Sequence, residues 1–404
     1  MKDFKYLVIG AGPAGLTFAN KLLQSKEDSF LVIEKESIAG GLCRSVEVDG
    51  SPLDIGGGHF LDVRRPQVND FLFRFMPEDE WNLHNRKTTL YVNGVEIGQP
   101  IEANIWQMRL EEQVAYLKSI AIAGCNRSEP MPEKFVDWIY WKLGKRIAED
   151  YMIPYNQKMF GKELDQLGTY WLEKLPNVSF EETLRSCLEK KAYGSDPGHT
   201  QFYYPKKYGY GELWKRMADN LGEHIIYNSV IKAIDFNTMT VTTDNGLRYT
   251  ADKIITTIPW IEYCEINGMP AEIKKSIRRL RFSSIQTEYF AERIDTDSHW
   301  IYYPDSEIAY HRILVRHNFC PNSKGYWTET NGERVGMCAP NRNYKYMNQY
   351  AYPLNTIQKP EIMKRLLDWA KKKNVFGLGR WGEHNHYNSD VTVELAIKLA
   401  DRLL

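Results

Sequence analysis

The sequence predicts an α/β protein that carries an inserted helical region and a second, antiparallel sheet, and three observations support this prediction. Near the N-terminus an apolar strand over residues 5–9 runs through a glycine-rich turn into a helix. Across 109–188 apolar residues recur about every three to four positions, which is typical of helices packed on a core. From residue 225 onward, runs of β-branched and aromatic residues alternate with turn residues, which indicates strands.

The N-terminal turn predicts a dinucleotide site of the Rossmann type. Gly10, Gly12 and Gly15 form a Gly-x-Gly-x-x-Gly pattern directly after the strand. The first glycine permits a tight turn, the second lets the backbone approach a pyrophosphate, and the third lets the helix pack close to the strand. Pro13 and Ala14 begin this helix, whose N-terminus attracts the anion.

A second strand and an acidic residue follow in register. Residues 30–33 are apolar and lead into Glu34 and Lys35. The carboxylate of Glu34 can accept hydrogen bonds from ribose hydroxyls. Because strand, helix, second strand and acid occur in order, a nucleotide site is favoured over a structural glycine turn without a ligand.

Two further glycine segments decide which dinucleotide is expected. Gly41 and Leu42 follow the second strand, and this pattern resembles the glutathione-reductase-type flavoproteins, in which a glycine pair runs beneath the FAD diphosphate. FAD is therefore favoured over NAD. Gly57 and Gly58 precede His59 and would bring bare backbone against a flat ring system, the alternative being an ordinary loop.

The C-terminal segment completes the expected FAD site. A strand at 375–377 stops at glycines, and a helix runs from 389 to 404. The flavoprotein resemblance implies that this helix points its positive end at the flavin, where Asp390 caps the helix and has no catalytic role. Outside the N-terminal motifs, the expected cofactor contacts are Val230, Gly379, Arg380, Asn388 and Asp390. Since no Cys or His stands in a recognised attachment motif, we expect FAD to be bound non-covalently.

Composition excludes several classes of function. The chain has 52 basic and 52 acidic residues, so its net charge is zero and it lacks the field that would attract nucleic acid or an anionic membrane. An anionic ligand therefore needs a local pocket. No apolar run approaches the ~20 residues of a membrane span, and the first strand begins almost at Met1, so a cytoplasmic protein is expected. Six scattered cysteines without a Cys-x-x-Cys pair predict neither a metal site nor a disulfide framework.

At 404 residues the chain exceeds one core, and we expect three interleaved parts. Residues 1–65, 203–265 and 370–404 form the FAD-binding domain, 66–202 form a mostly helical insertion, and 266–369 form an antiparallel sheet that contacts the substrate. The strands expected in this last part are 284–290, 300–303, 309–316 and 334–338.

Past the FAD motifs, the chain resembles the UDP-galactopyranose mutases, and its pieces are closer to the eukaryotic-type branch than to the short bacterial one. The match is spread along most of the chain. The segments that carry it are 54–59, with one glycine more than the family's flavin loop, 154–160, 202–214, 300–312 with its Tyr-to-Arg spacing, 352–353 and 379–382.

The resemblance implies that Tyr302, Arg312 and Tyr352 hold a nucleotide-sugar diphosphate. The chemistry of these side chains agrees, because a buried pyrophosphate needs charge-assisted donors, and arginine supplies a fork while tyrosine adds a hydroxyl without further charge. A solvated strand arginine and core tyrosines are the alternatives. Asn156 falls in another segment matched to the family, and we include it among the expected substrate contacts.

At two positions the sequence differs from the family's pattern, and these differences make the identity of the substrate less certain to follow from the resemblance than that of the flavin. Lys174 stands near the place of a second diphosphate arginine, and His386 lies where the family has a tyrosine in a longer loop. A different nucleotide sugar or a related ring contraction therefore stays open. The partners expected are a nucleotide-sugar substrate, an external reductant such as NAD(P)H and a second copy of the chain, with no nucleic acid and no membrane span.

The resemblance implies a mutase that interconverts pyranose and furanose forms of a nucleotide sugar, with N5 of reduced flavin as the nucleophile. His59 at the flavin and Arg312 at the diphosphate are the expected catalytic residues. The first alternative is an amine oxidase, a protoporphyrinogen oxidase or a desaturase of the same superfamily. The second is a flavin-free binding module resembling the Rab GDP-dissociation inhibitors, against which the intact glycine motif argues.

Overall fold

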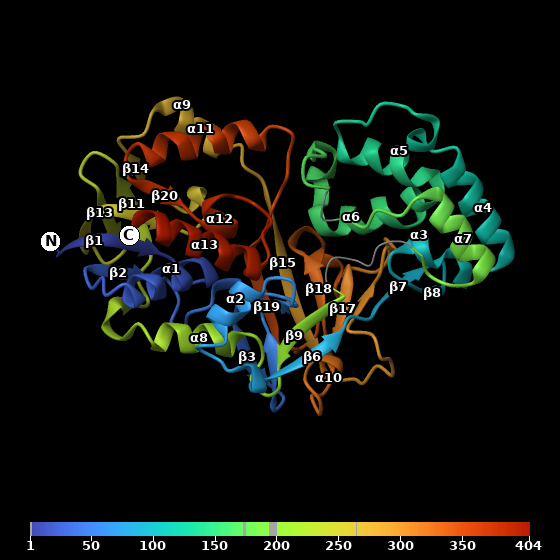
Figure 1. Ribbon diagram of the computed structural model, residues 1–404, viewed down its shortest axis with the longest axis horizontal. Helices are drawn as coiled ribbons and strands as arrows, with labels where there is room; N and C mark the ends of the chain where they lie inside the picture. Colours follow the sequence, from blue (N-terminus) through green and yellow to red (C-terminus); the bar gives the residue numbers. More distant parts are fainter. Residues whose placement is uncertain (1, 173–174, 194–199, 264) are drawn as a thin grey trace.

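An eight-stranded sheet assembled from distant parts of the chain forms the core of the nucleotide fold (Figure 1). The computed structural model describes residues 2–172, 175–193, 200–263 and 265–404. The strands run in the order β10 (Ile225–Ile226), β2 (Phe30–Ile33), β1 (Lys2–Ile9), β13 (Arg248–Thr256), β12 (Thr240–Thr243), β11 (Ile231–Asp235) and β14 (Glu265–Asn267), with β20 (Val375–Gly377) beside β13. β1 lies parallel to β2 and β13, as a Rossmann-type sheet requires.

Helices cover both faces of this sheet, because β1 is apolar on both of its sides. Tyr6 and Val8 pack into the core that contains helices α1 (Pro13–Gln24), α8 (Gly211–Asp219) and α13 (Ser389–Leu403). Leu7 and Ile9 point the other way, into the core formed with α9 (Ala271–Ile277) and α11 (Lys359–Lys371). α1 also packs directly on α13 (Figure 1), so the predicted N-terminal and C-terminal parts of the nucleotide fold meet.

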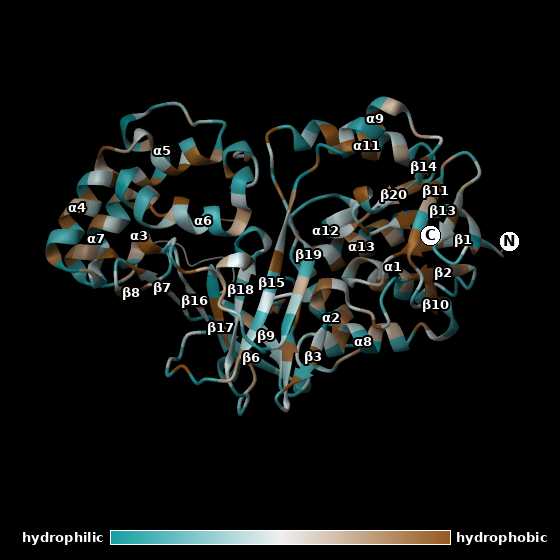
Figure 2. Ribbon diagram, turned by 180° about the vertical axis from the view of Figure 1, so that it is seen from behind, coloured by the Kyte–Doolittle hydropathy of each residue, from teal (hydrophilic) through white to brown (hydrophobic). Residues whose placement is uncertain are grey.

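A seven-stranded sheet forms the second layer. Its order is β19 (Lys345–Pro353), β15 (Phe282–Phe290), β18 (Tyr326–Asn331), β17 (Arg312–Val315), β16 (Trp300–Tyr302), β7 (Thr88–Val92) and β8 (Val95–Gly98). Neighbouring strands are antiparallel except for the parallel pair β16 and β7. Figure 2 shows β15 and β19 running between the nucleotide fold and the helical part of the chain.

Two details of this sheet differ from the sequence prediction. The strand expected at 334–338 is wrong, because Gly332–Met337 forms a 3₁₀ helix after β18. Asn331 ends the strand there, and its side chain accepts a hydrogen bond from the Glu333 N–H, which starts the helical turn. Strand β19 was not predicted, although it supplies one edge of the sheet.

The helical unit, α3 to α7, stands to one side of both sheets (Figure 1). It comprises α3 (Ile101–Asn104), α4 (Leu110–Ala121), α5 (Phe135–Ile147), α6 (Ile153–Phe160) and α7 (Phe180–Glu189). Gly144, at φ 72°, kinks α5, and α6 packs against β15 and β18. Residues 66–202 also contain α2 (Pro66–Leu72), β6 (Trp81–Asn85), β7 and β8, so the helices of this unit begin only at Ile101. The domain boundaries themselves stay a prediction.

The smaller elements connect these layers. They are β3 (Ser45–Val48), β4 (Ser51–Asp54), β5 (Leu61–Asp62), β9 (Gln201–Pro205), α2 (Pro66–Leu72), α10 (Arg316–Phe319) and α12 (Gly379–Gly382). The predicted α/β class, with a Rossmann-type part, a helical part and an antiparallel sheet, is confirmed. Within the described residues, none of the helices has the length and apolar character to cross a membrane.

Candidate active site

A cavity of about 350 Å³ opens at the carboxyl ends of β1 and β2, the place where a doubly wound sheet binds its nucleotide. The residues that line it include most of the predicted cofactor contacts: Gly10, Gly12, Pro13, Ala14, Glu34, Lys35, Gly41, Leu42, His59, Val230 and Arg380. Ser229, Thr257 and Cys43 line it as well and were not predicted.

The glycines of the N-terminal turn have different roles: Gly15 allows close packing, whereas Gly12 leaves space for a ligand. Gly10 has a φ of 97°, in the region that favours glycine. A Cβ on Gly15 would lie 2.0 Å from the Gly10 carbonyl oxygen, so Gly15 sets the close packing of α1 and does not line the cavity. A Cβ on Gly12 would meet nothing nearer than the Gly41 Cα at 3.9 Å. The space beside Gly12 is therefore open to a ligand, and it fits a pyrophosphate.

Glu34 is held in place for a ribose. Its carboxylate accepts hydrogen bonds from the N–H of Ala11 at 2.7 Å and of Glu36 at 3.0 Å, and the residue is 6% exposed. Burial raises the pKa of Glu34, while the two N–H groups counteract this rise. The fixed carboxylate and the open backbone at Gly12 together fit the nucleotide half of FAD.

The loop of 56–58 approaches the active site, although only part of it lines a cavity. Gly57, at φ 95°, packs on Glu329, because its Cβ would lie 2.7 Å from the Glu329 Oε1. The Gly58 N–H donates to the same oxygen at 3.2 Å. Gly58 lines a second, neighbouring cavity, which is described below. The loop is thus fixed from behind by a carboxylate of the second sheet.

His59 lies where the two cavities meet. Its Nδ1 is 2.9 Å from the Gly57 carbonyl oxygen. Burial, assisted by the positive charge of Arg380, lowers the pKa of His59 to about 4, so the ring is neutral near pH 7. Because a carbonyl only accepts, Nδ1 carries the proton, and Nε2 is left as a hydrogen-bond acceptor.

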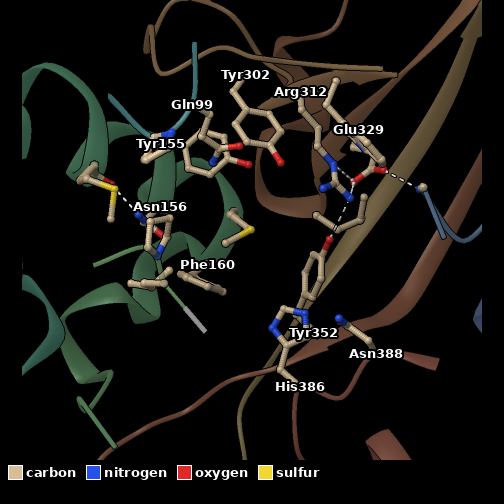
Figure 3. A pocket seen from close by; sticks show the side chains of 18 of the residues that line it. Gln99, Tyr155, Asn156, Phe160, Tyr302, Arg312, Glu329, Tyr352, His386 and Asn388 are labelled. Carbon is tan, nitrogen blue, oxygen red and sulfur yellow. Dashed lines mark hydrogen bonds and ion pairs between the residues drawn. The ribbon is translucent and has the colours of Figure 1, made fainter. Parts of the chain in front are cut away.

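The second cavity measures about 330 Å³ and lies between the seven-stranded sheet and the helical unit. His59, Arg380 and Ser389 line both cavities, so the two adjoin one another. The predicted substrate contacts that line the second cavity are Tyr302, Arg312, Tyr352, Asn156 and His386 (Figure 3). Lys174 lies outside the described residues.

Arg312 is anchored by a buried carboxylate on the next strand. Its Nε and Nη2 donate to Glu329 Oε2 at 2.8 and 2.7 Å, and Nη2 also lies 3.3 Å from the Tyr352 hydroxyl. Burial alone would raise the pKa of Glu329, but Arg312 and His311 outweigh it and lower this pKa to about 2. Among the described residues, Nη1 of Arg312 has no hydrogen-bond partner, so it can donate to an anion. Figure 3 shows the side chain between Glu329 and Tyr352.

Two more guanidinium groups line the second cavity. Arg86 donates to the Tyr302 hydroxyl at 3.1 Å and lies 4.7 Å from the Trp300 ring centre. Arg380 donates to the carbonyls of Tyr387 and Ala351. The described lining of this cavity carries three guanidinium groups and two carboxylates, Glu102 and Glu329, so its formal charge is positive by one. No sequence motif marked Arg86, because it follows β6 and reaches the cavity only when β7 joins the sheet beside β16.

The start of α13 differs from the prediction for Asp390. Asn388 is the N-cap residue and lines the second cavity, whereas Asp390 accepts from Arg65 Nε at 2.6 Å. The expectation that Asp390 caps the helix is wrong, since an ion pair holds its carboxylate on the side of α2. Gly379 similarly packs on α1, where its Cβ would lie 2.7 Å from the Ala14 Cβ.

We expect acid precipitation to release all of the flavin. Cys43 is the one thiol among the described residues that line the cofactor cavity, and burial raises its pKa to about 12, so it stays protonated and unreactive. The measurement is the flavin absorbance of the supernatant and of the pellet. A pellet that retains its yellow colour contradicts non-covalent binding.

The comparisons with known proteins agree with this geometry. Residues 13–285 match the family described as flavin containing amine oxidoreductase. The chain is 22% identical to UDP-galactopyranose mutase of Mycoplasma pneumoniae, over 99% of this chain and 96% of the relative. A crystal structure of reduced UDP-galactopyranose mutase matches with a TM-score of 0.89 at 21% identity, over 99% of this chain and 93% of the other.

A more distant solved structure has the same fold. A putative protoporphyrinogen oxidase from an Exiguobacterium species matches with a TM-score of 0.71 at 13% identity, over 100% of this chain and 98% of the other. At these sequence identities, the similar structures establish the fold. The resemblance to the UDP-galactopyranose mutases that the sequence motifs indicated is confirmed, and the similarity extends along 99% of the chain. The family match covers more than half of the chain and confirms the flavin, which leaves the flavin-free binding module without support. The chain is a flavoenzyme with FAD as its cofactor, and it belongs to the flavin containing amine oxidoreductase family.

Proposed function

We propose that this chain interconverts the pyranose and furanose forms of a nucleotide sugar, as the name UDP-galactopyranose mutase states for its relatives. The observation that carries the proposal is the second cavity, which is lined by Arg86, Arg312 and Arg380 and adjoins the cofactor cavity at Arg380 and His59. Such a site fits a diphosphate, because buried guanidinium groups offer charge-assisted donors in a fixed geometry.

Bound FAD in its reduced form would supply, at N5, a nucleophile for the anomeric carbon of the sugar. The chain itself then needs no nucleophilic side chain, and its task is to bind and orient. Arg312, Tyr302 and Tyr352 would hold the diphosphate, which is the leaving group. Glu329 keeps the Arg312 fork in one orientation, so the anion meets donors that are already aligned.

His59 would act as a neutral acceptor at the junction. With a pKa of about 4 it does not hold a second proton near pH 7, but its Nε2 can accept a hydrogen bond from a hydroxyl or N–H group brought there. Its ring lies nearly parallel to that of Tyr210, at 6.3 Å between centres, and Tyr210 in turn bonds Ser389 at 2.7 Å. The hydrogen bond from Nδ1 to the Gly57 carbonyl oxygen keeps the imidazole where it lines both cavities.

An amine-oxidising function is the weaker candidate for this site. Amines are cations near neutral pH, and the cavity lining carries three guanidinium groups against two carboxylates, so its net positive charge disfavours them. The similarity to the protoporphyrinogen oxidase shows a shared fold and does not by itself support an oxidase function for this chain. An external reductant such as NAD(P)H and a homo-oligomer stay predictions.

The proposal predicts turnover only by the reduced protein. Dithionite-reduced protein should convert UDP-galactofuranose to UDP-galactopyranose, and air-oxidised protein should not, because only the reduced flavin is nucleophilic. Chromatographic separation of the two nucleotide sugars measures this. The substrate is supplied at high concentration, so that weak binding of the nucleotide does not prevent detection of the reaction. No conversion by the reduced protein would contradict the proposal.

A further inference from the structure

Lys158 is a buried lysine to which the proposed function gives no role. It lies on α6, within the segment 154–160, and is 1% exposed. Its Nζ donates to the carbonyl oxygens of Tyr303 and Asp305, each at 2.7 Å. Within the described parts of the chain, no carboxylate forms an ion pair with it, and burial, assisted by the positive charge of Arg334, lowers its pKa to about 7. Because lysine is rarely buried without a specific partner, the two carbonyl groups indicate what this side chain holds.

These carbonyl groups belong to the connection between β16 and β17, residues 303–311. The connection contains no helix or strand, so contacts from other elements must fix it in place. Arg334, from the 3₁₀ helix after β18, donates to the carbonyl oxygens of Ser306, Ile308 and Ala309. Lys158 holds the first residues of the connection from the side of the helical unit.

The two ends of this connection carry expected substrate contacts. Tyr302 is the last residue of β16, Arg312 is the first residue of β17, and the two are register partners in the hairpin. The N–H of Tyr303 donates to the His311 carbonyl at 2.9 Å and closes the connection. Both Tyr302 and Arg312 line the second cavity. A shift of the connection would therefore move the hydroxyl and the guanidinium that are proposed to hold the diphosphate.

The helix that carries Lys158 also forms a wall of the second cavity. Tyr155, Asn156 and Phe160 of α6 line this cavity, whereas Lys158 is not among the described residues that line it. Tyr155 and Lys158 are three residues apart and therefore share one face of the helix. The rings of Tyr155 and Tyr302 lie 5.1 Å apart between centres (Figure 3). The helical wall and the hairpin thus meet at one ring contact and at the two hydrogen bonds of Lys158.

We propose that Lys158 is a positioning residue for the diphosphate site: its two hydrogen bonds join the helical wall of the second cavity to the hairpin and thereby set where Tyr302 and Arg312 lie. This inference rests on the proposed nucleotide-sugar function. Hydrogen bonds have a defined length and direction, whereas the ring contact of Tyr155 with Tyr302 tolerates sliding. Donors that are already in place spare the ligand the cost of ordering them.

Lys158→Met tests the inference, because methionine keeps an apolar stem of similar length and removes the amine. In the FAD-loaded protein, the affinity for UDP should fall at least about fivefold, measured by displacement of a fluorescent UDP probe. In the conversion of UDP-galactofuranose by the reduced protein, KM should rise while kcat per bound flavin changes little. The reason is that these donors bind the diphosphate in the ground state and the transition state alike.

Two further variants support the measurement. Lys158→Gln keeps an N–H donor for one of the two carbonyl groups and should lose less affinity than Lys158→Met. Lys162→Met is the matched control, because Lys162 lies two residues beyond the end of α6 and its side chain is 77% exposed. Its ion pair with Glu333 is a surface pair of small energy, so the control should bind UDP as the wild type does.

The outcomes separate this inference from the proposed function. Wild-type affinity for UDP in a flavin-loaded Lys158→Met protein overturns the positioning role and leaves the mutase proposal standing. An unchanged KM, with activity that falls only in proportion to lost FAD, also overturns it, since Lys158 would then support only the fold. If Lys158→Met does not retain FAD, the same criteria are applied to Lys158→Gln. If the wild-type protein does not bind UDP, the nucleotide-sugar function itself fails.

Discussion

Replacing Arg312 by alanine is expected to weaken the binding of a nucleoside diphosphate about 30-fold to several-thousand-fold. Truncating one partner of a buried charge pair costs about 2–5 kcal/mol. Arg312 contributes the guanidinium that Glu329 and Tyr352 hold in the substrate cavity, and the neutral chain has no general field to replace it. The measurement is displacement of a fluorescent nucleotide by an unlabelled nucleoside diphosphate.

The Arg312→Ala change also strands the carboxylate of Glu329, which is 1% exposed and would lose its main cationic partner. Arg312→Ala combined with Glu329→Gln removes this buried charge, and the amide oxygen of the new side chain can still accept from Gly58. The double variant should keep its FAD, since the flavin diphosphate is expected at the distant Gly12. Arg312→Lys should restore only part of the affinity, because an ammonium group lacks the fork. Wild-type affinity in the double variant would exclude Arg312 from the site.

Gly12→Val should abolish FAD binding while the protein stays folded. Gly12 has φ −82° and ψ −177°, which is extended backbone that valine adopts readily. Within the protein, its Cβ would approach nothing closer than 3.9 Å, so the added side chain projects into the space proposed for the pyrophosphate. The measurements are the flavin absorbance of the purified protein and its circular dichroism.

Two other glycines distinguish loss of the ligand from loss of the fold. Gly336→Val should retain both FAD and fold, since a Cβ at Gly336 meets nothing within 4 Å. Gly15→Val should destabilise the fold, because its Cβ would overlap the Gly10 carbonyl. A folded, fully yellow Gly12→Val protein would show that the pyrophosphate does not lie beside Gly12.

The parts of the site that depend on local chain geometry could be predicted from the sequence. The turn at Gly10 and the carboxylate of Glu34 act within a single βαβ unit, so their spacing alone determines where they lie. Arg86 and Glu102 could not be predicted in this way. Arg86 reaches the cavity because β7 adds to the edge of the second sheet, and Glu102 because the helical unit packs over that sheet.

Long-range packing also explains the local errors. The apolar run at 334–338 resembles a strand, but Asn331 caps a 3₁₀ turn before it can continue the sheet. Asp390 has the residue type of a helix cap, and its carboxylate is instead taken by Arg65 from a segment 325 residues away. The spacing of apolar residues and the residue types indicate which secondary structure a segment can adopt. Interactions with residues elsewhere in the chain determine which one it adopts.

Counting product molecules against reducing equivalents separates a mutase from an oxidoreductase. Protein reduced with one equivalent of dithionite per flavin, without air, is mixed with an excess of UDP-galactofuranose, and flavin absorbance and products are followed together. We predict many molecules of the pyranose form per flavin, with the flavin still reduced at the end, because the isomerisation transfers no net electrons. Reoxidation of the flavin in step with one product per flavin would contradict the mutase function.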